Sequence, residues 1–139
     1  TSPDAVPQEA LQAWMDDGIL DWWGKRDDMP AVFAQSHIVC LPSSYGEGVP
    51  KVLIEAAACA RPIVATNAPG CREIVRHEEN GLLYTVGEQA QLNNALETLI
   101  DQPTLRQQYG TAGRAIAQAG FSLEDVTSET LSVYEKLLL

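Results

Sequence analysis

Basic side chains and long apolar runs are both scarce in this chain. Its 139 residues include 9 Lys and Arg against 19 Asp and Glu, which gives a formal net charge of −10 at pH 7. So acidic a chain is poorly suited to binding nucleic acid or an anionic membrane surface, and we expect no nucleic-acid partner. No stretch approaches the roughly 18 apolar residues of a membrane span. We therefore expect a cytoplasmic protein.

Cysteine and histidine are also few. Cys40, Cys59 and Cys71 are odd in number and lack metal-type spacing, and the two histidines, His37 and His77, stand far apart. This pattern predicts reduced cysteines that act as small apolar side chains, and no metal site. The length and the 45% content of hydrophobic residues are typical of one domain with its own core.

The apolar pattern alternates between strand and helix periods. Strands are predicted over 19–23, 37–41, 62–65 and 81–84, and the continuously apolar 37–41 is expected to be covered on both faces. Helices are predicted over 3–17, 30–35, 50–60, 89–100 and 104–118, with a helical turn over 71–75 and a last helix after Ser122. Short strand–helix–strand connections predict a Rossmann-like α/β fold with a parallel sheet, spanning 1–139 and closed by helices over 89–139.

The most informative segment runs from Leu41 to Thr66, LPSSYGEGVPKVLIEAAACARPIVAT. A Gly-rich turn follows a buried-type strand and leads into a helix, an arrangement that places backbone N–H groups where a phosphate can bind. Pro50 suits the first helical position, because its missing N–H costs nothing there. The residues of the predicted phosphate turn are Gly46, Gly48, Val49, Pro50, Lys51 and Val52.

Two glutamates, Glu47 and Glu55, flank this helix start with seven residues between them. Glu55 falls in an Ala- and Val-rich helix, where a charged side chain needs partners such as the hydroxyls of a ribose. Two simpler roles stay open at this point: Glu47 as a helix cap, and Glu55 as the ion-pair partner of Lys51 four residues earlier.

Several blocks carry a family resemblance. They are Glu47–Gly48–x–Pro50–x4–Glu55–Ala56, Arg61–Pro62–Ile63–Val64–Ala65–Thr66, Pro69–Gly70–Cys71–Arg72–Glu73–Ile74–Val75 and Asn80–Gly81–Leu82–Leu83. Together they resemble the C-terminal half of a GT-B glycosyltransferase of the retaining, nucleotide-sugar-dependent group (group 1, or family 4). The resemblance covers nearly all of the chain.

The resemblance implies a role for each matching residue. Glu47 would contact the donor sugar near its reactive end as the catalytic residue, and Glu55 would hold the ribose. The turn amides around Gly48 and Lys51 would hold the diphosphate. The segment that includes Gly24, Lys25 and Arg26 would border the nucleobase pocket. The donor substrate would be a nucleotide-diphosphate sugar, used without a metal or other cofactor.

The implied reaction is transfer of a sugar, of hexosyltransferase type, to an acceptor hydroxyl with retention. The acceptor would be a glycan or lipid-linked glycan bound by an N-terminal domain. The pathway would be bacterial polysaccharide or lipopolysaccharide assembly, and the full-length protein would lie peripheral to the inner face of the membrane. The alternatives are a non-catalytic nucleotide-sugar binding module and an epimerase of GT-B type.

The chain departs from the family pattern in three ways that matter. Tyr45–Gly46 precedes Glu47 where relatives often carry a bulkier or basic residue, which leaves the sugar specificity open. Ala60 stands where the family commonly has glycine; in a left-handed conformation alanine costs about 1 kcal/mol, so the helix end is open to rearrangement. The family's opening strand and its Gly-Arg…Lys-Gly block have no match in residues 1–36. We therefore expect the chain to lack the first strand–helix unit, to bind nucleotide weakly, to transfer nothing alone, and to be open to self-association through an unpaired strand.

Overall fold

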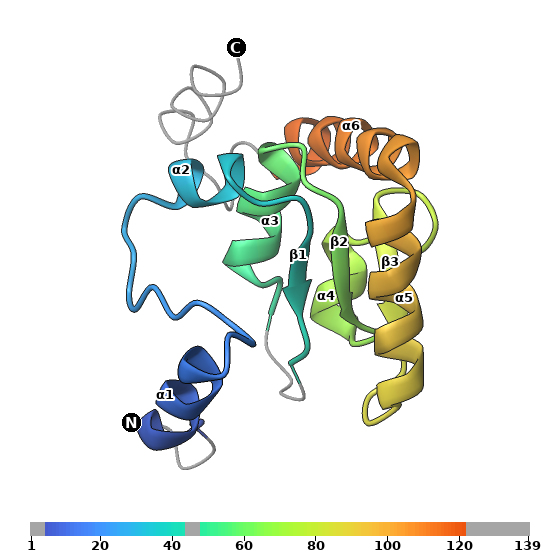
Figure 1. The fold of residues 1–139 in the computed structure, drawn as a ribbon. Coiled ribbons are helices and arrows are strands. Elements are labelled where there is room, and N and C mark those ends of the chain that lie inside the picture. Colours follow the sequence, from blue (N-terminus) through green and yellow to red (C-terminus); the bar gives the residue numbers. More distant parts are fainter. Residues whose placement is uncertain (1–4, 44–47, 122–139) are drawn as a thin grey trace.

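The computed structural model describes residues 5–43 and 48–121, and its centre is a three-stranded parallel sheet (Figure 1). The strands lie in the order β1 (Val39–Leu41), β2 (Ile63–Thr66) and β3 (Gly81–Tyr84). Neighbouring strands begin level with each other, since Ile63 of β2 pairs with both Val39 and Gly81. The helices are α1 (Gln8–Asp16), α2 (Met29–Ala34), α3 (Lys51–Ala58), α4 (Pro69–Ile74), α5 (Gln89–Asp101) and α6 (Pro103–Gly120). The predicted Rossmann-like α/β fold is confirmed.

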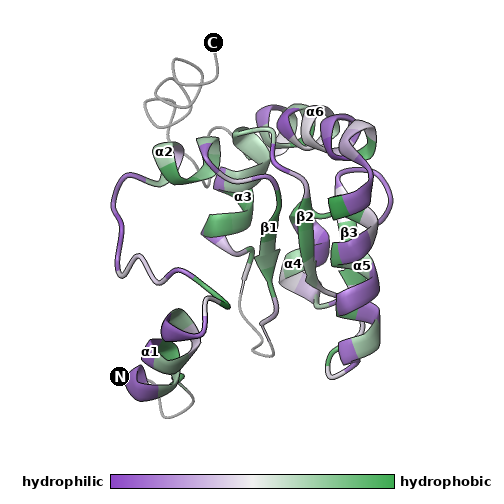
Figure 2. Cartoon of the chain, in the orientation of Figure 1, coloured by the Kyte–Doolittle hydropathy of each residue, from purple (hydrophilic) through white to green (hydrophobic). Residues whose placement is uncertain are grey.

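Two hydrophobic clusters lie on opposite faces of the sheet. On one face, Ile63 and Ala65 of β2 pack with α3 and α4, the two crossover helices. On the other face, Val64 and Tyr84 pack with Leu99 of α5. This alternation along β2 is expected of a strand covered on both sides, and all four of its residues are buried. Figure 2 shows the strands and most of α3 in the green of apolar residues.

Helix α6 joins the two layers. Its Tyr109 belongs to the cluster beneath α5, whereas Ile116 and Ala117 belong to the cluster beneath α3. At the end of α3, Nη1 of Arg114 donates a hydrogen bond to the carbonyl of Ala58 over 2.7 Å. Gly110 allows α6 to approach the end of α3 closely, because a Cβ at that position would lie 2.2 Å from the carbonyl oxygen of Ala60. The C-terminal end of α3 is therefore held firmly by α6.

The last turn of α3 closes through a left-handed residue. Ala60 has φ +57°. The N–H of Arg61 donates to the carbonyl of Ala56 over 3.0 Å, and that of Ala60 to Ala57 over 2.9 Å, the hydrogen bonds of a Schellman cap. The helix end has not been rearranged to spare the alanine. The helix end keeps the left-handed geometry that favours glycine, although the residue there is alanine.

The turn between α4 and β3 is built around one buried amide. Asn80 is fully buried, donates from Nδ2 to the carbonyl of Ile74 over 3.0 Å and accepts from the N–H of Arg76 over 2.7 Å. The next residue, Gly81, faces the backbone of β2, where a Cβ would lie 2.2 Å from the carbonyl oxygen of Ile63. The Asn80–Gly81 pair of the family pattern thus has a structural role here.

The strand predicted over residues 19–23 is wrong. This segment belongs to no strand, and Ile19, Trp22 and Trp23 are 67%, 55% and 49% exposed. A strand needs a hydrogen-bonded neighbour, and β1, the nearest edge of the sheet, pairs with β2 alone among the described strands. The chain instead leads from α1 to α2 as an irregular connection (Figure 1).

The expectation that residues 37–41 are covered on both faces holds only in part, since Ile38 packs against the cluster that includes Leu99. Val39 and Leu41 pack against the α3 cluster, but Cys40, whose side chain points to the other face, is exposed. Helix α5, which covers that face, contacts β2 and β3. In the part of the chain that the structure describes, no helix is long and apolar enough to span a membrane.

Candidate functional site

The predicted phosphate turn lies at the carboxyl end of β1. The chain leaves the sheet after Leu41 and enters α3 at Lys51, with Pro50 as the N-cap rather than the first helical residue. The helix therefore begins one residue later than predicted. Its carbonyl accepts hydrogen bonds from the N–H groups of Leu53 and Ile54, over 3.1 and 3.3 Å. Because a proline N-cap has no side-chain acceptor, the first amides of the helix need another partner.

Backbone donors gather at this helix start. The N–H groups of Gly48, Val49, Lys51 and Val52 make no hydrogen bond with any described residue. The first turn of α3 carries no acidic side chain that could compensate the positive end of the helix dipole. Free amides and a helix dipole together favour an anion such as a phosphate. The role of this helix start in holding a diphosphate stays a prediction.

Glu55 lies one turn further along α3. It is 9% exposed and sits between apolar residues, Ile54 before it and Ala56 after it, which are buried. Nζ of Lys51 lies 3.7 Å from its Oε1, so the ion pair considered as an alternative is formed, although the distance exceeds that of a hydrogen bond. Lys51 itself is 76% exposed, and such a contact offsets little of the cost of burying a carboxylate. Glu55 can still accept hydrogen bonds from a ligand.

Four other predicted residues are not placed at this helix start by any described contact. Gly46 and Glu47 lie outside the described residues, so their predicted roles stay predictions. Gly24, with φ +69°, and Lys25 are exposed in the connection between α1 and α2. In the described ranges, no hydrogen bond or ion pair links either of them to residues 48–55. Their place beside a nucleobase also stays a prediction.

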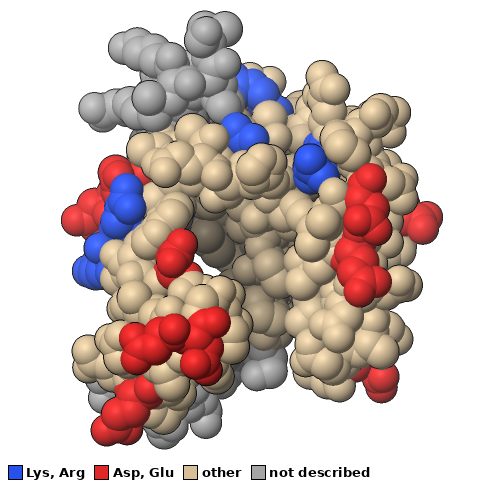
Figure 3. Space-filling model, viewed as in Figure 1, with Lys and Arg blue, Asp and Glu red and all other residues tan. Residues whose placement is uncertain are grey.

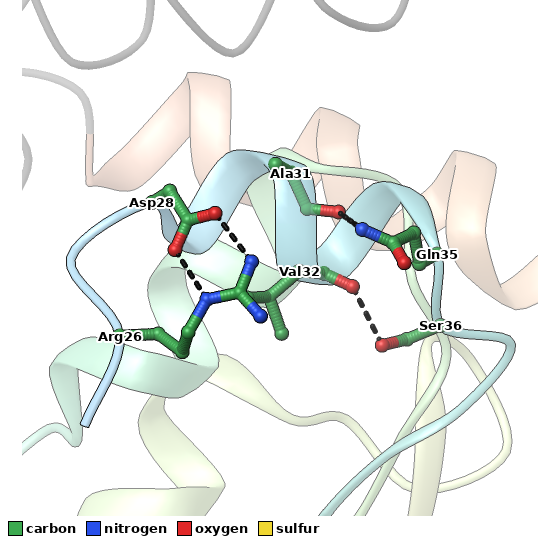
Figure 4. A network of polar contacts seen from close by, with 6 residues as sticks. All are labelled: Arg26, Asp28, Ala31, Val32, Gln35 and Ser36. Carbon is green, nitrogen blue, oxygen red and sulfur yellow. Dashed lines mark hydrogen bonds and ion pairs between the residues drawn. The ribbon is translucent and has the colours of Figure 1, made fainter. Parts of the chain in front are cut away.

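Arg26 is held away from the donor turn by its own neighbours. Its Nε and Nη2 donate to the two carboxylate oxygens of Asp28, over 2.6 and 2.5 Å, and its guanidinium lies 5.4 Å from the ring centre of Trp23. The hydrogen bonds from Arg26 lower the pKa of the Asp28 carboxyl to about 2. Figure 4 shows this pair at the start of α2, with Gln35 and Ser36 bonded to the carbonyls of Ala31 and Val32 at its end.

Two polar residues at the same edge of the sheet were missed. Asn67 directly follows β2, and its Oδ1 accepts a hydrogen bond from Nη1 of Arg72 on α4 over 3.0 Å. They line a hollow of about 470 Å³ together with Arg76 and His77. The signals available from sequence were the position of Asn67 directly after a parallel strand and that of Arg72 inside the PGCREIV block. Among the described residues, no three His, Cys, Asp or Glu side chains gather as a metal site would require.

A parallel sheet with amides and a buried carboxylate at its carboxyl edge defines a nucleotide-binding type of α/β domain. The comparison with known families is more specific. Residues 18–116 match the family described as glycosyl transferases group 1, and the chain belongs to that family.

Relatives and solved structures agree with this assignment. An uncharacterised glycosyltransferase of Haemophilus influenzae is 35% identical over 106 residues, which cover 76% of this chain and 30% of the relative. The phosphatidyl-myo-inositol mannosyltransferase of Mycobacterium leprae is 34% identical over 114 residues, covering 81% of this chain and 30% of that enzyme. Anabaena HepE, solved in complex with UDP, is 31% identical with a TM-score of 0.75, covering 94% of this chain and 36% of HepE. The chain thus spans about a third or less of the length of these relatives.

Proposed function

We propose that this chain is the donor-binding part of a glycosyltransferase that uses a nucleotide-diphosphate sugar. The observation that carries the proposal is the buried carboxylate of Glu55 one turn after the helix start, where the backbone amides of Gly48, Val49, Lys51 and Val52 have no hydrogen-bond partner among the described residues. The amides suit a diphosphate and the carboxylate suits the two hydroxyls of a ribose, so one helix offers both contacts in the order that a nucleotide presents them.

The remaining roles follow from the family. Glu47 acts on the donor sugar near its reactive carbon, and the sugar, a hexose, is transferred to an acceptor hydroxyl with retention. The acceptor is a glycan or lipid-linked glycan of bacterial polysaccharide assembly, bound by a further domain on the cytoplasmic side of the membrane. The support is the membership of the family and the solved complexes of HepE with UDP and with UDP-glucose.

The ribose role of Glu55 is tested by titrating UDP into the chain and into its Glu55→Gln variant by calorimetry or NMR. We expect the variant to bind about tenfold more weakly or worse, because it loses a charge-assisted hydrogen bond. Glu97→Gln, an exposed change on α5, is the matched control and should leave the affinity unchanged. Equal affinities of all three proteins would refute the ribose role.

Catalysis is tested in the complete enzyme with a Glu47→Gln variant. We expect transfer to be lost while UDP still binds, because Glu47 is assigned to the sugar and not to the nucleotide. NMR of the product gives the configuration at the anomeric carbon, and an inverted product would refute retention. An epimerised sugar, or nucleotide-sugar binding with no transfer by the unaltered enzyme, would favour the epimerase or the non-catalytic module instead.

A further inference from the structure

A second, cationic hollow lies at the opposite end of the sheet from the donor turn. It has a volume of about 320 Å³, and its lining includes His37, Arg61, Arg106, Gln107 and Thr111. His37 stands two residues before β1, and Arg61 two residues before β2, so the hollow opens at the amino ends of the strands. The donor turn follows the carboxyl end of β1, so the two places are separated by the length of the strands.

The charge of this hollow contrasts with that of the chain. Acidic residues outnumber basic ones by 19 to 9, yet no carboxylate of residues 5–43 or 48–121 lines it. In Figure 3, one group of basic atoms lies near the top of the view, around α6, and another lies on the left flank beside acidic atoms, whereas most acidic atoms lie lower and along the flanks. Like charges without a counter-ion repel each other, so this grouping favours an anion in the hollow.

The two arginines of the hollow differ in the hydrogen bonds that their side chains already make. Nη1 of Arg106 donates to the carbonyls of Leu99 and Ile100, over 2.7 and 2.8 Å, at the end of α5. The backbone N–H of Arg61 closes the cap of α3, but its guanidinium has no hydrogen bond or ion pair with any described residue, and its Nε is buried without a partner among them. A guanidinium without an acceptor is costly in a partly buried position, and an anion in the hollow that Arg61 lines is the kind of acceptor that would recover part of that cost.

We propose that this hollow is a binding site for a small phosphate-type oxyanion, with Arg61 as its principal ligand. Guanidinium groups bind phosphate through paired N–H donors, and Arg106 and His37 add further donors around the same space. The volume lies near the lower limit of small-molecule sites, which suits inorganic phosphate or a small phosphorylated compound rather than a nucleotide sugar. The proposal is independent of the proposed function, because it concerns the other edge of the sheet.

The test uses inorganic phosphate and NMR of the arginine Nε–Hε groups at constant ionic strength. We expect a saturable shift of the Arg61 signal with phosphate, and none with the same concentration of chloride. Acetate, added in a separate titration, distinguishes a phosphate site from a general site for carboxylates. The Nε–Hε signal of Arg26, which donates to Asp28 and lines neither hollow, serves as the internal reference.

Two variants make the outcome decisive. Arg61→Gln should weaken phosphate binding at this site by about tenfold or more, while Arg72→Gln should not. Thr111→Asp, an exposed change on α6 that places a carboxylate at the lining, should abolish the shift without touching Arg61. The proposal is overturned if the Arg61 signal does not saturate, if chloride or acetate shifts it equally, or if phosphate shifts only the amides of residues 48–52.

Discussion

Replacing Ala60 by glycine should stabilise this protein, although most alanine-to-glycine changes do the opposite. Ala60 has φ +57° in the Schellman cap of α3, a conformation that costs an L-residue roughly 1–2 kcal/mol and glycine almost nothing. Glycine also raises the entropy of the unfolded chain, which takes back about 0.4–1 kcal/mol. The difference is about 0–1.6 kcal/mol, and its central value of about 0.8 kcal/mol is the expected net gain in the free energy of unfolding.

The assay is urea unfolding followed by circular dichroism, with thermal unfolding as a second measure. A gain of this size should raise the melting temperature by roughly 2–5 °C in a chain of this length. Ala115→Gly is the matched control, because Ala115 is exposed in the interior of α6 and should lose about 0.5–1 kcal/mol by the same chemical change. If both variants lose stability to the same extent, the reasoning from the left-handed conformation is refuted.

Three further outcomes are expected. Gly110→Ala should destabilise the chain by several kcal/mol or prevent its folding, because the new Cβ would meet the carbonyl of the α3 cap at 2.2 Å; near-normal urea unfolding would contradict this contact. At pH 8 a thiol reagent should label the exposed Cys40 well before Cys59, since burial raises the pKa of Cys59 to about 11; equal rates would argue against the packing of α3. In an NMR titration the carboxyl of Asp28 should have a pKa near 2 that returns toward 3.8 in Arg26→Gln, and no change would argue against this pair.

The sequence predicted the strands of the sheet and the helices packed on it better than the segment before α2, which does not pack on the sheet. The strands over 62–65 and 81–84 and the helices over 50–60 and 104–118 appear within a few residues of their predicted ends. The apolar residues of these strands and helices pack in the two hydrophobic clusters, so the apolar period in the sequence matches the buried positions in the structure. The segment 19–23 has the composition of a strand, but composition does not supply the neighbour that a strand must pair with.

The candidate site was predictable to the same limited extent. Pro50, the amides beside it and Glu55 could be placed on one helix start because each is local in sequence. Asn67 and Arg72 reach the same edge through a different crossover, which a single turn motif does not reveal. The positive φ of Ala60 could be anticipated only from the glycine that the family commonly has at this position. Alanine itself has no preference for that conformation.

The position of α6 has a consequence for how the protein unfolds. The sheet separates two apolar clusters that share few side chains, and each could in principle melt by itself. Because Tyr109 lies in one cluster and Ile116 in the other, loss of α6 would expose both at once. The helix thus couples the halves thermodynamically, and we expect a single cooperative transition in which hydrogen exchange of β2 and of α3 reports the same free energy.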